Sequence, residues 1–153
     1  MRLDLPDPVP GRPPPSEDHA LLDVPIAVST QAPRAAREVV GAALVEWMPA
    51  AIVERAQLVV SELVTNSVVH SGAAAGEDVT VRLRALAPRC RIEVEDPGRG
   101  GAIAPRTPDP LRGGGMGLHL VAAMSECWGV IRNDDGPSRV WAQLLDADGA
   151  GQD

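Results

Sequence analysis

The chain alternates between segments with helix-like and segments with strand-like spacing of apolar residues. The longest helix-like segment is 51–70, in which apolar side chains recur at steps of three and four residues. Its apolar positions are Ile52, Ala56, Val59, Val60, Leu63, Val64 and Val68. An apolar surface this broad predicts a helix that buries most of its circumference against a sheet.

A strand and a helix are predicted before this segment. Residues 21–28 have strand character, and Pro25 confines that strand to the edge of a sheet because proline lacks a backbone N–H. Ser29 or Thr30 is suited to cap the helix that follows, which ends near Pro49.

Two hairpins and one more helix are predicted after it. Residues 79–86 and 90–95 alternate apolar with polar side chains and should pair as an antiparallel hairpin. Residues 118–127 follow a run of glycines and are predicted to be helical. Residues 128–131 and 138–145 then close the domain as a second hairpin.

Length and composition indicate one domain with loose ends. Of the 153 residues, 21–146 should form the globular part, because 1–20 are Pro-rich with few apolar side chains and 147–153 are polar. We expect the first segment to be a disordered tail, with a docking arm for a partner as the alternative.

The charge balance excludes several functions. The chain has 14 Arg, no Lys and 21 acidic residues, so its net charge is −7. This charge predicts no basic surface for nucleic acid or an anionic membrane. The absence of Lys excludes a P-loop ATP-binding protein, an ordinary protein kinase with its strand Lys, and an enzyme that forms a Lys Schiff base. Proteins and small ligands are the expected partners.

The cysteines and tryptophans are expected to be structural. Cys90 and Cys127 form no CxxC motif, which favours reduced, mostly buried thiols, with a single disulfide as the alternative. Trp47, Trp128 and Trp141 should fill the core, since the chain has no Phe or Tyr. No apolar run approaches the ~18 residues that span a membrane, so a cytoplasmic location is expected.

Glu62 and Asn66 are the first candidates for chemistry. They are four residues apart and therefore share one face of the 51–70 helix, within an otherwise apolar stretch. A carboxylate and a carboxamide in this setting suit a site that holds Mg²⁺ and orients an attacking oxygen at a nucleotide phosphate.

Two glycine-rich motifs follow. Residues 96–101 read Asp-Pro-Gly-Arg-Gly-Gly at the end of a strand, where the backbone can approach a ligand closely. The Pro-rich segment 102–112 is expected to be a loop or lid. Residues 113–117 read Gly-Gly-Gly-Met-Gly before a helix, where exposed N–H groups and the helix dipole favour an anion.

In this order, the three motifs resemble the N, G1 and G2 boxes of the GHKL superfamily of ATP-binding domains. Over residues 20–145 the chain is similar to the stand-alone anti-sigma factor serine/threonine kinases of the RsbW and SpoIIAB type. Shorter stretches add to this resemblance: Gly115-Met116-Gly117-Leu118, Trp128-Gly129 and Val140-Trp141-Ala142. It implies the Bergerat-type α/β (α+β) two-layer sandwich, with a mixed, largely antiparallel sheet and helices on one face.

The resemblance also implies a role for each box. Asp96 would accept a hydrogen bond from the adenine amino group, Asn66 would coordinate Mg²⁺, and Glu62 would act as the general base. The residues implied to line the nucleotide are Gly98, Gly100, Arg112, Gly113, Gly115, Met116, Gly117 and Leu118. Arg99 and Arg112 flank the lid, where either would meet the γ-phosphate.

The implied function is a Mg-ATP-dependent serine/threonine protein kinase that regulates transcription. It would bind a sigma factor and phosphorylate a STAS-type anti-anti-sigma protein, and the family suggests a homodimer. One alternative is a nucleotide-gated binding module without catalysis. Another is a detached histidine-kinase catalytic domain, which is disfavoured because His19 falls in the expected tail and His119 lies beside the glycine run.

Overall fold

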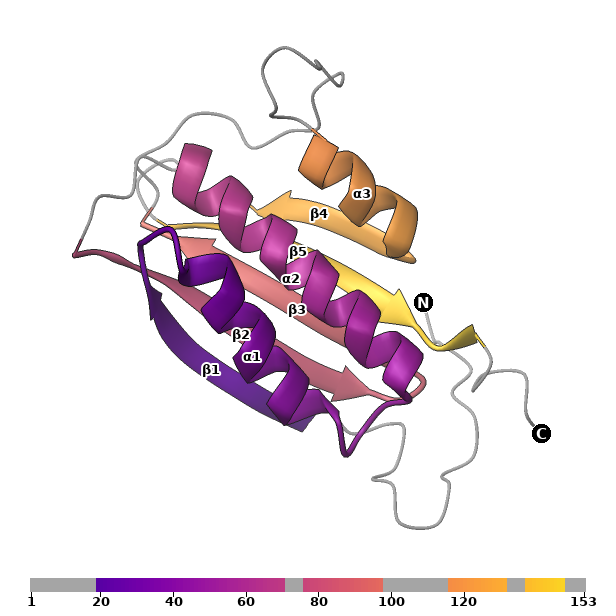
Figure 1. Ribbon diagram of the computed structural model, residues 1–153. Coiled ribbons are helices and arrows are strands. Elements are labelled where there is room, and N and C mark those ends of the chain that lie inside the picture. Colours follow the sequence, from indigo (N-terminus) through magenta and orange to yellow (C-terminus); the bar gives the residue numbers. More distant parts are fainter. Residues whose placement is uncertain (1–18, 71–75, 98–115, 132–136, 148–153) are drawn as a thin grey trace.

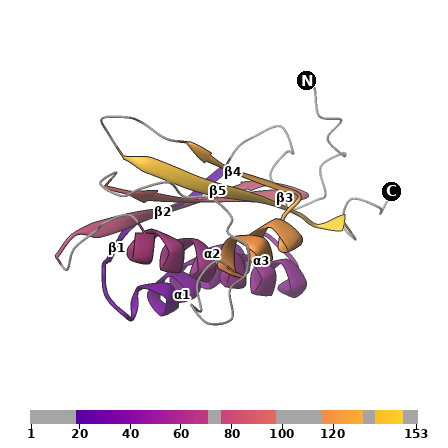
Figure 2. The same ribbon diagram turned by 90° about the horizontal axis from the view of Figure 1, so that it is seen from above.

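The computed structural model describes residues 19–70, 76–97, 116–131 and 137–147. These residues form two layers, a five-stranded sheet and a layer of three helices (Figure 1). Figure 2 shows that all three described helices cover the same face of the sheet. The expected two-layer α+β sandwich is therefore confirmed.

The sheet contains the strands β1 (His19–Ala27), β2 (Asp78–Leu86), β3 (Arg89–Asp96), β4 (Cys127–Ile131) and β5 (Ser138–Leu145). Their spatial order is β1-β2-β3-β5-β4, and every pair of neighbours among these described strands is antiparallel. The sheet is thus not mixed, because hairpins connect β2 to β3 and β4 to β5. As Pro25 indicated, β1 lies at an edge, and it includes His19, which the sequence had assigned to the tail.

The helices are α1 (Ala32–Leu44), α2 (Ala50–His70) and α3 (Met116–Met124). The expected cap of α1 is wrong, because Gln31 occupies the N-cap position without a side-chain hydrogen bond. Ser29 Oγ instead accepts the N–H of Gln31 at 3.1 Å, within the preceding turn. The expected end of α3 is also wrong, because Cys127 begins β4 and pairs with Gln143 of β5.

The core lies between the helices and the sheet. Alternate residues of β2 and β3 point towards the helices and are fully buried, among them Val81, Leu83 and Ile92. From the other side α2 buries Val60, Leu63, Val64 and their neighbours. Because each fully buried apolar side chain of this size contributes about 1.5–3 kcal/mol, this contact fixes α2 on the sheet.

The outer face of the sheet carries charged side chains in mutual contact. Arg82 of β2 lies 3.4 Å from Asp23 and 3.1 Å from Glu95, joining β1, β2 and β3. Arg91 contacts Glu93 at 2.9 Å, and its guanidinium lies 4.3 Å from the centroid of the Trp141 ring. This face is consequently polar and held by interactions between strands.

The three tryptophans do not all belong to the core. Trp47 and Trp128 are partly buried and pack against it, as expected. Trp141 lies between two residues of β5 that face the core, Val140 and Ala142, so its ring points to the outer face. A Cβ atom on Gly129 would lie 2.9 Å from that ring, so glycine at this position leaves room for the Trp141 side chain.

The two cysteines are free, as expected, but only one is buried. Burial raises the pKa of Cys90 to about 12, whereas Cys127 is exposed at the start of β4. Because the thiolate is the reacting form, we predict that in the native protein a thiol-specific reagent modifies Cys127 rapidly and Cys90 only after denaturation. The control is Cys127→Ser, which should leave no rapidly reacting thiol, and equal native rates for the two thiols would contradict the structure.

Candidate functional site

The second half of α2 places Glu62 and Asn66 at the border of the core. Their neighbours Leu63 and Val64 are fully buried against the sheet, and this fixes the rotation of the helix. Glu62 and Asn66 are therefore left half-buried on an adjoining face. The common face expected from their spacing is confirmed.

Glu62 lies against the first turn of α3. Its Oε2 atom is 2.6 Å from the position that a Cβ atom on Gly117 would occupy. Within the described residues the carboxylate makes no hydrogen bond or ion pair, and its contact there is the packing against α3. The N box and the start of the G2-box helix, 55 residues apart in the chain, are thus in contact.

Asn66 has an unsatisfied amide. Its Nδ2 atom is buried and has no hydrogen-bond partner within the described part of the chain, and the same holds for Oγ of the neighbouring Ser67. Leaving a buried polar group unpaired costs about 1–3 kcal/mol. Such groups are expected where a ligand or water completes the bonding.

Asp96 ends β3 on the side of the sheet that faces the helices. It continues the buried set Ile92 and Val94 at two-residue spacing, and its exposed fraction is only 4%. A carboxylate at this place, at the end of a strand and next to a glycine-rich motif, is suited to accept a hydrogen bond from a ligand. Its position agrees with the sequence-based expectation.

The candidate residues gather at one end of the molecule. Figure 1 shows the end of β3, the second half of α2 and the start of α3 at the same end. Leu118, the third residue of α3, is buried and anchors this helix in the core. The order of the boxes in the sequence therefore becomes a cluster in space.

Several expected site residues cannot be placed. Those outside the described residues are Gly98, Arg99, Gly100, Arg112, Gly113 and Gly115. Met116 is the first residue of α3, and Gly117 follows it.

Sequence reasoning missed two contacts around Glu62. It assigned Gly117 to phosphate binding and did not anticipate the approach of Glu62, because the chain gives no spacing rule for residues so far apart. It also missed Arg37 of α1, whose Nη1 lies 3.4 Å from Oγ of Ser61, the residue before Glu62. The only signal was the helical spacing of both segments.

Among the described residues, one side chain at this site is suited to hold a metal together with a ligand. The described residues contain no group of three or more His, Cys, Asp and Glu that could bind a metal. The amide oxygen of Asn66 is a suitable single ligand for Mg²⁺, which usually takes one or two protein ligands together with phosphate oxygens and water.

Comparison with known proteins agrees with this geometry. Residues 26–144 match the family of histidine kinase-like ATPase domains, so the chain belongs to that family, which is the GHKL superfamily. No curated protein matches the sequence. None of the described helices is long and apolar enough to cross a membrane.

A solved structure shares the fold. It contains the RsbU and RsbW domains of Rv1364c from Mycobacterium tuberculosis, with 17% sequence identity and a TM-score of 0.62. The match covers 85% of this chain and 32% of that one, so the chain spans about a third of its structural neighbour. The chain is thus a histidine kinase-like ATPase domain, and this neighbour shares its fold.

The contact between Glu62 and Gly117 can be tested by Gly117→Ala. The added methyl group must displace the flexible end of Glu62, so we expect the free energy of unfolding to change by less than about 1 kcal/mol. ATP turnover should nevertheless fall by about 10²-fold, because the displaced Glu62 carboxylate is the candidate reacting group. Denaturant unfolding and a turnover assay provide the two measurements.

The matched control is Gly41→Ala, in which the methyl group meets the end of Gln57 between α1 and α2, away from Glu62. Its turnover should be normal. Equal turnover in both variants would show that the position of Glu62 is unimportant.

Proposed function

We propose that this protein is a Mg-ATP-dependent serine/threonine kinase that regulates transcription. In this proposal it binds a sigma factor and phosphorylates a STAS-type anti-anti-sigma protein. It acts in the cytoplasm as a homodimer. The observation that carries the proposal is the position of the Glu62 carboxylate against Gly117, one helical turn from the buried Asn66 Nδ2 atom, which has no hydrogen-bond partner among the described residues. The family match and the RsbW-type neighbour support it.

The adenine end of ATP is assigned to Asp96. Its carboxylate would accept a hydrogen bond from the amino group on C6 of adenine. Guanine has a carbonyl oxygen at C6 instead. Its burial supports this role, because a charged hydrogen bond is stronger away from water. The glycines at 98 and 100 would let the backbone run beside the base.

The phosphate end is assigned to the start of α3. Free N–H groups in the first turn of a helix and the helix dipole attract anions, and the glycines allow close approach. Besides Gly117, the residues assigned here are Gly113, Gly115, Met116, Leu118 and Arg112. With no Lys in the chain, Arg112 would meet the γ-phosphate.

Asn66 is assigned to Mg²⁺. Its amide oxygen would be the metal ligand, and its buried Nδ2 atom, which has no hydrogen-bond partner in the described part of the chain, would donate to an oxygen of the bound ligand. A bound Mg²⁺ would supply positive charge that stabilises the phosphate oxygens. Because Asn66 is uncharged, most of the metal's other ligands would be oxygens of ATP and water.

Glu62 is assigned the role of general base in phosphoryl transfer. The hydroxyl oxygen of the acceptor Ser or Thr bonds to the γ-phosphorus as its proton passes to the Glu62 carboxylate. The bond from the γ-phosphorus to the bridging oxygen breaks, and ADP leaves with the electron pair. Positioning and charge provide most of the catalysis in such reactions, and a general base adds about 10²- to 10⁴-fold.

ATP binding is tested by calorimetric titration of wild type and Asp96→Asn. We expect ATP to bind the wild type, with Mg²⁺ strengthening the binding, and the variant to bind ATP about ten- to hundredfold more weakly. Inosine triphosphate, which has a carbonyl oxygen in place of that amino group, should bind the wild type weakly, because two acceptors would face each other, and should gain affinity in the variant, whose amide can donate to that oxygen. Asp23→Asn on β1, an exposed carboxylate, is the control, and an unchanged affinity in Asp96→Asn would refute the adenine assignment.

Catalysis is tested by radiolabelled phosphoryl transfer to a cognate STAS protein. Glu62→Gln should lower the rate by about 10²- to 10⁴-fold while leaving ATP affinity nearly unchanged, because the amide cannot accept the proton. Glu54→Gln, an exposed position on the same helix, should react at the wild-type rate. If wild type binds ATP but never labels the STAS protein, the alternative holds, and the protein is a nucleotide-gated binding module without catalysis.

A further inference from the structure

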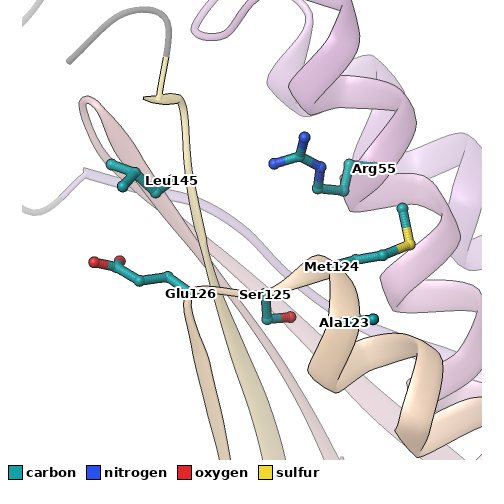
Figure 3. Close-up of a pocket in the computed structure, with 6 residues that line it drawn as sticks. All are labelled: Arg55, Ala123, Met124, Ser125, Glu126 and Leu145. Carbon is teal, nitrogen blue, oxygen red and sulfur yellow. The ribbon is translucent and has the colours of Figure 1, made fainter. Parts of the chain in front are cut away.

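A second pocket lies at the opposite end of α2 and α3 from the nucleotide site. It has a volume of about 460 Å³ and is lined by Arg55, Ala123, Met124, Ser125, Glu126 and Leu145 (Figure 3). Pockets of a few hundred Å³ are typical of small-ligand sites. This pocket shares no residue with the nucleotide site described above.

The helix registers show how far apart the two sites are. Arg55 precedes Glu62 by seven residues, and Met124 follows Gly117 by seven residues. With a rise of 1.5 Å per residue, each interval is about 10 Å along its helix. Since Glu62 touches α3 at Gly117 and Arg55 lines a pocket with Met124, the two helices run antiparallel between the two sites.

Arg55 brings an uncompensated positive charge to the pocket. Its side chain is partly buried and forms no hydrogen bond or ion pair with any residue of the described segments. Burial raises the pKa of Cys90 in the neighbouring core, and the charge of Arg55 opposes that rise, so its field reaches the interior. In Figure 3 the guanidinium extends from α2 into the space between the helices and Leu145.

The acidic residue of the pocket does not neutralise this charge. Glu126 accepts two hydrogen bonds from Arg89, at 2.8 and 3.0 Å, and one from Gln143 at 3.1 Å. The hydrogen bond from Arg89 is the main reason why the pKa of Glu126 is lowered. Figure 3 shows its carboxylate pointing away from Arg55.

A second polar group in the pocket is unpaired. Oγ of Ser125 is buried and has no hydrogen-bond partner among the described residues. Arg55 extends from α2 and Ser125 belongs to the connection between α3 and β4, so the pocket has two donors without acceptors among the described residues, one from each element. A partly buried guanidinium and a buried hydroxyl in one pocket are suited to bind an acceptor group of a ligand.

We propose that this pocket binds a small organic monocarboxylate with a short aliphatic chain. The carboxylate would accept hydrogen bonds from the Arg55 guanidinium and the Ser125 hydroxyl, a charge-assisted arrangement. Ala123, Met124 and Leu145 provide apolar walls for the chain of the ligand. A phosphate dianion fits less well, because a single cation and one hydroxyl leave most of its oxygens without donors.

The test is a titration of ¹⁵N-labelled full-length protein with sodium butyrate, followed by NMR. The amides of Ser125, Glu126 and Leu145 should shift in a saturable way, with a dissociation constant of about 1 mM or lower. Butyramide, the uncharged analogue, should produce no saturable shift, and inorganic phosphate should bind at least about tenfold more weakly than butyrate.

Two variants and one control make the test specific. Arg55→Gln should weaken butyrate binding by about ten- to hundredfold, and Ser125→Ala by a smaller factor. Arg34→Gln, which removes a highly exposed Arg from α1, should bind butyrate like the wild type. The amide spectrum of each variant reports whether it is folded.

Three results would overturn the proposal. The first is a linear response to butyrate, which indicates non-specific binding. The second is equal binding of butyrate and butyramide, and the third is unchanged butyrate affinity in folded Arg55→Gln.

Discussion

The structure depends on the burial of α2 against the sheet. Leu63 and Val64 have no exposed surface, and they meet the inward-facing residues of β2 and β3. This packing leaves one rotation of the helix about its axis. Because an α-helix has 3.6 residues per turn, the direction of Leu63 also fixes the directions of Glu62 and Asn66. The position of the reactive groups is thus a by-product of the hydrophobic core.

The same core explains why the site can be polar without weakening the fold. Glu62 and Asn66 lie at its border, where one side of the helix faces α3 and the end of the sheet. The Asn66 Nδ2 atom, which has no partner among the described residues, is a small local cost within a large apolar contact. The outer face of the sheet differs, since there Arg82, Glu95 and Arg139 satisfy one another across the strands.

The sequence was sufficient for the elements and their layers, because the period of apolar residues decides helix or strand and Pro25 marks an edge. It predicted the wrong end for α3, since pairing of Cys127 with β5 overrides local helix propensity. The sequence led to a wrong placement of Trp141, because neither the size of this side chain nor its apolar neighbours determine which face of the strand the ring occupies. Contacts between distant segments, such as Glu62 with Gly117 or Arg55 with the end of α3, follow from packing and have no local pattern.

The missing side chain at Gly117 also constrains how this sequence can diverge. The space beside its Cα atom is already used by the carboxylate of Glu62. A lineage that keeps the Glu62 carboxylate in its present position must therefore keep glycine at position 117, whereas one that has lost both the acid and phosphate binding at this turn is free to acquire a side chain there. The two positions should thus covary, and the residue at 117 becomes a record of whether selection still acts on Glu62.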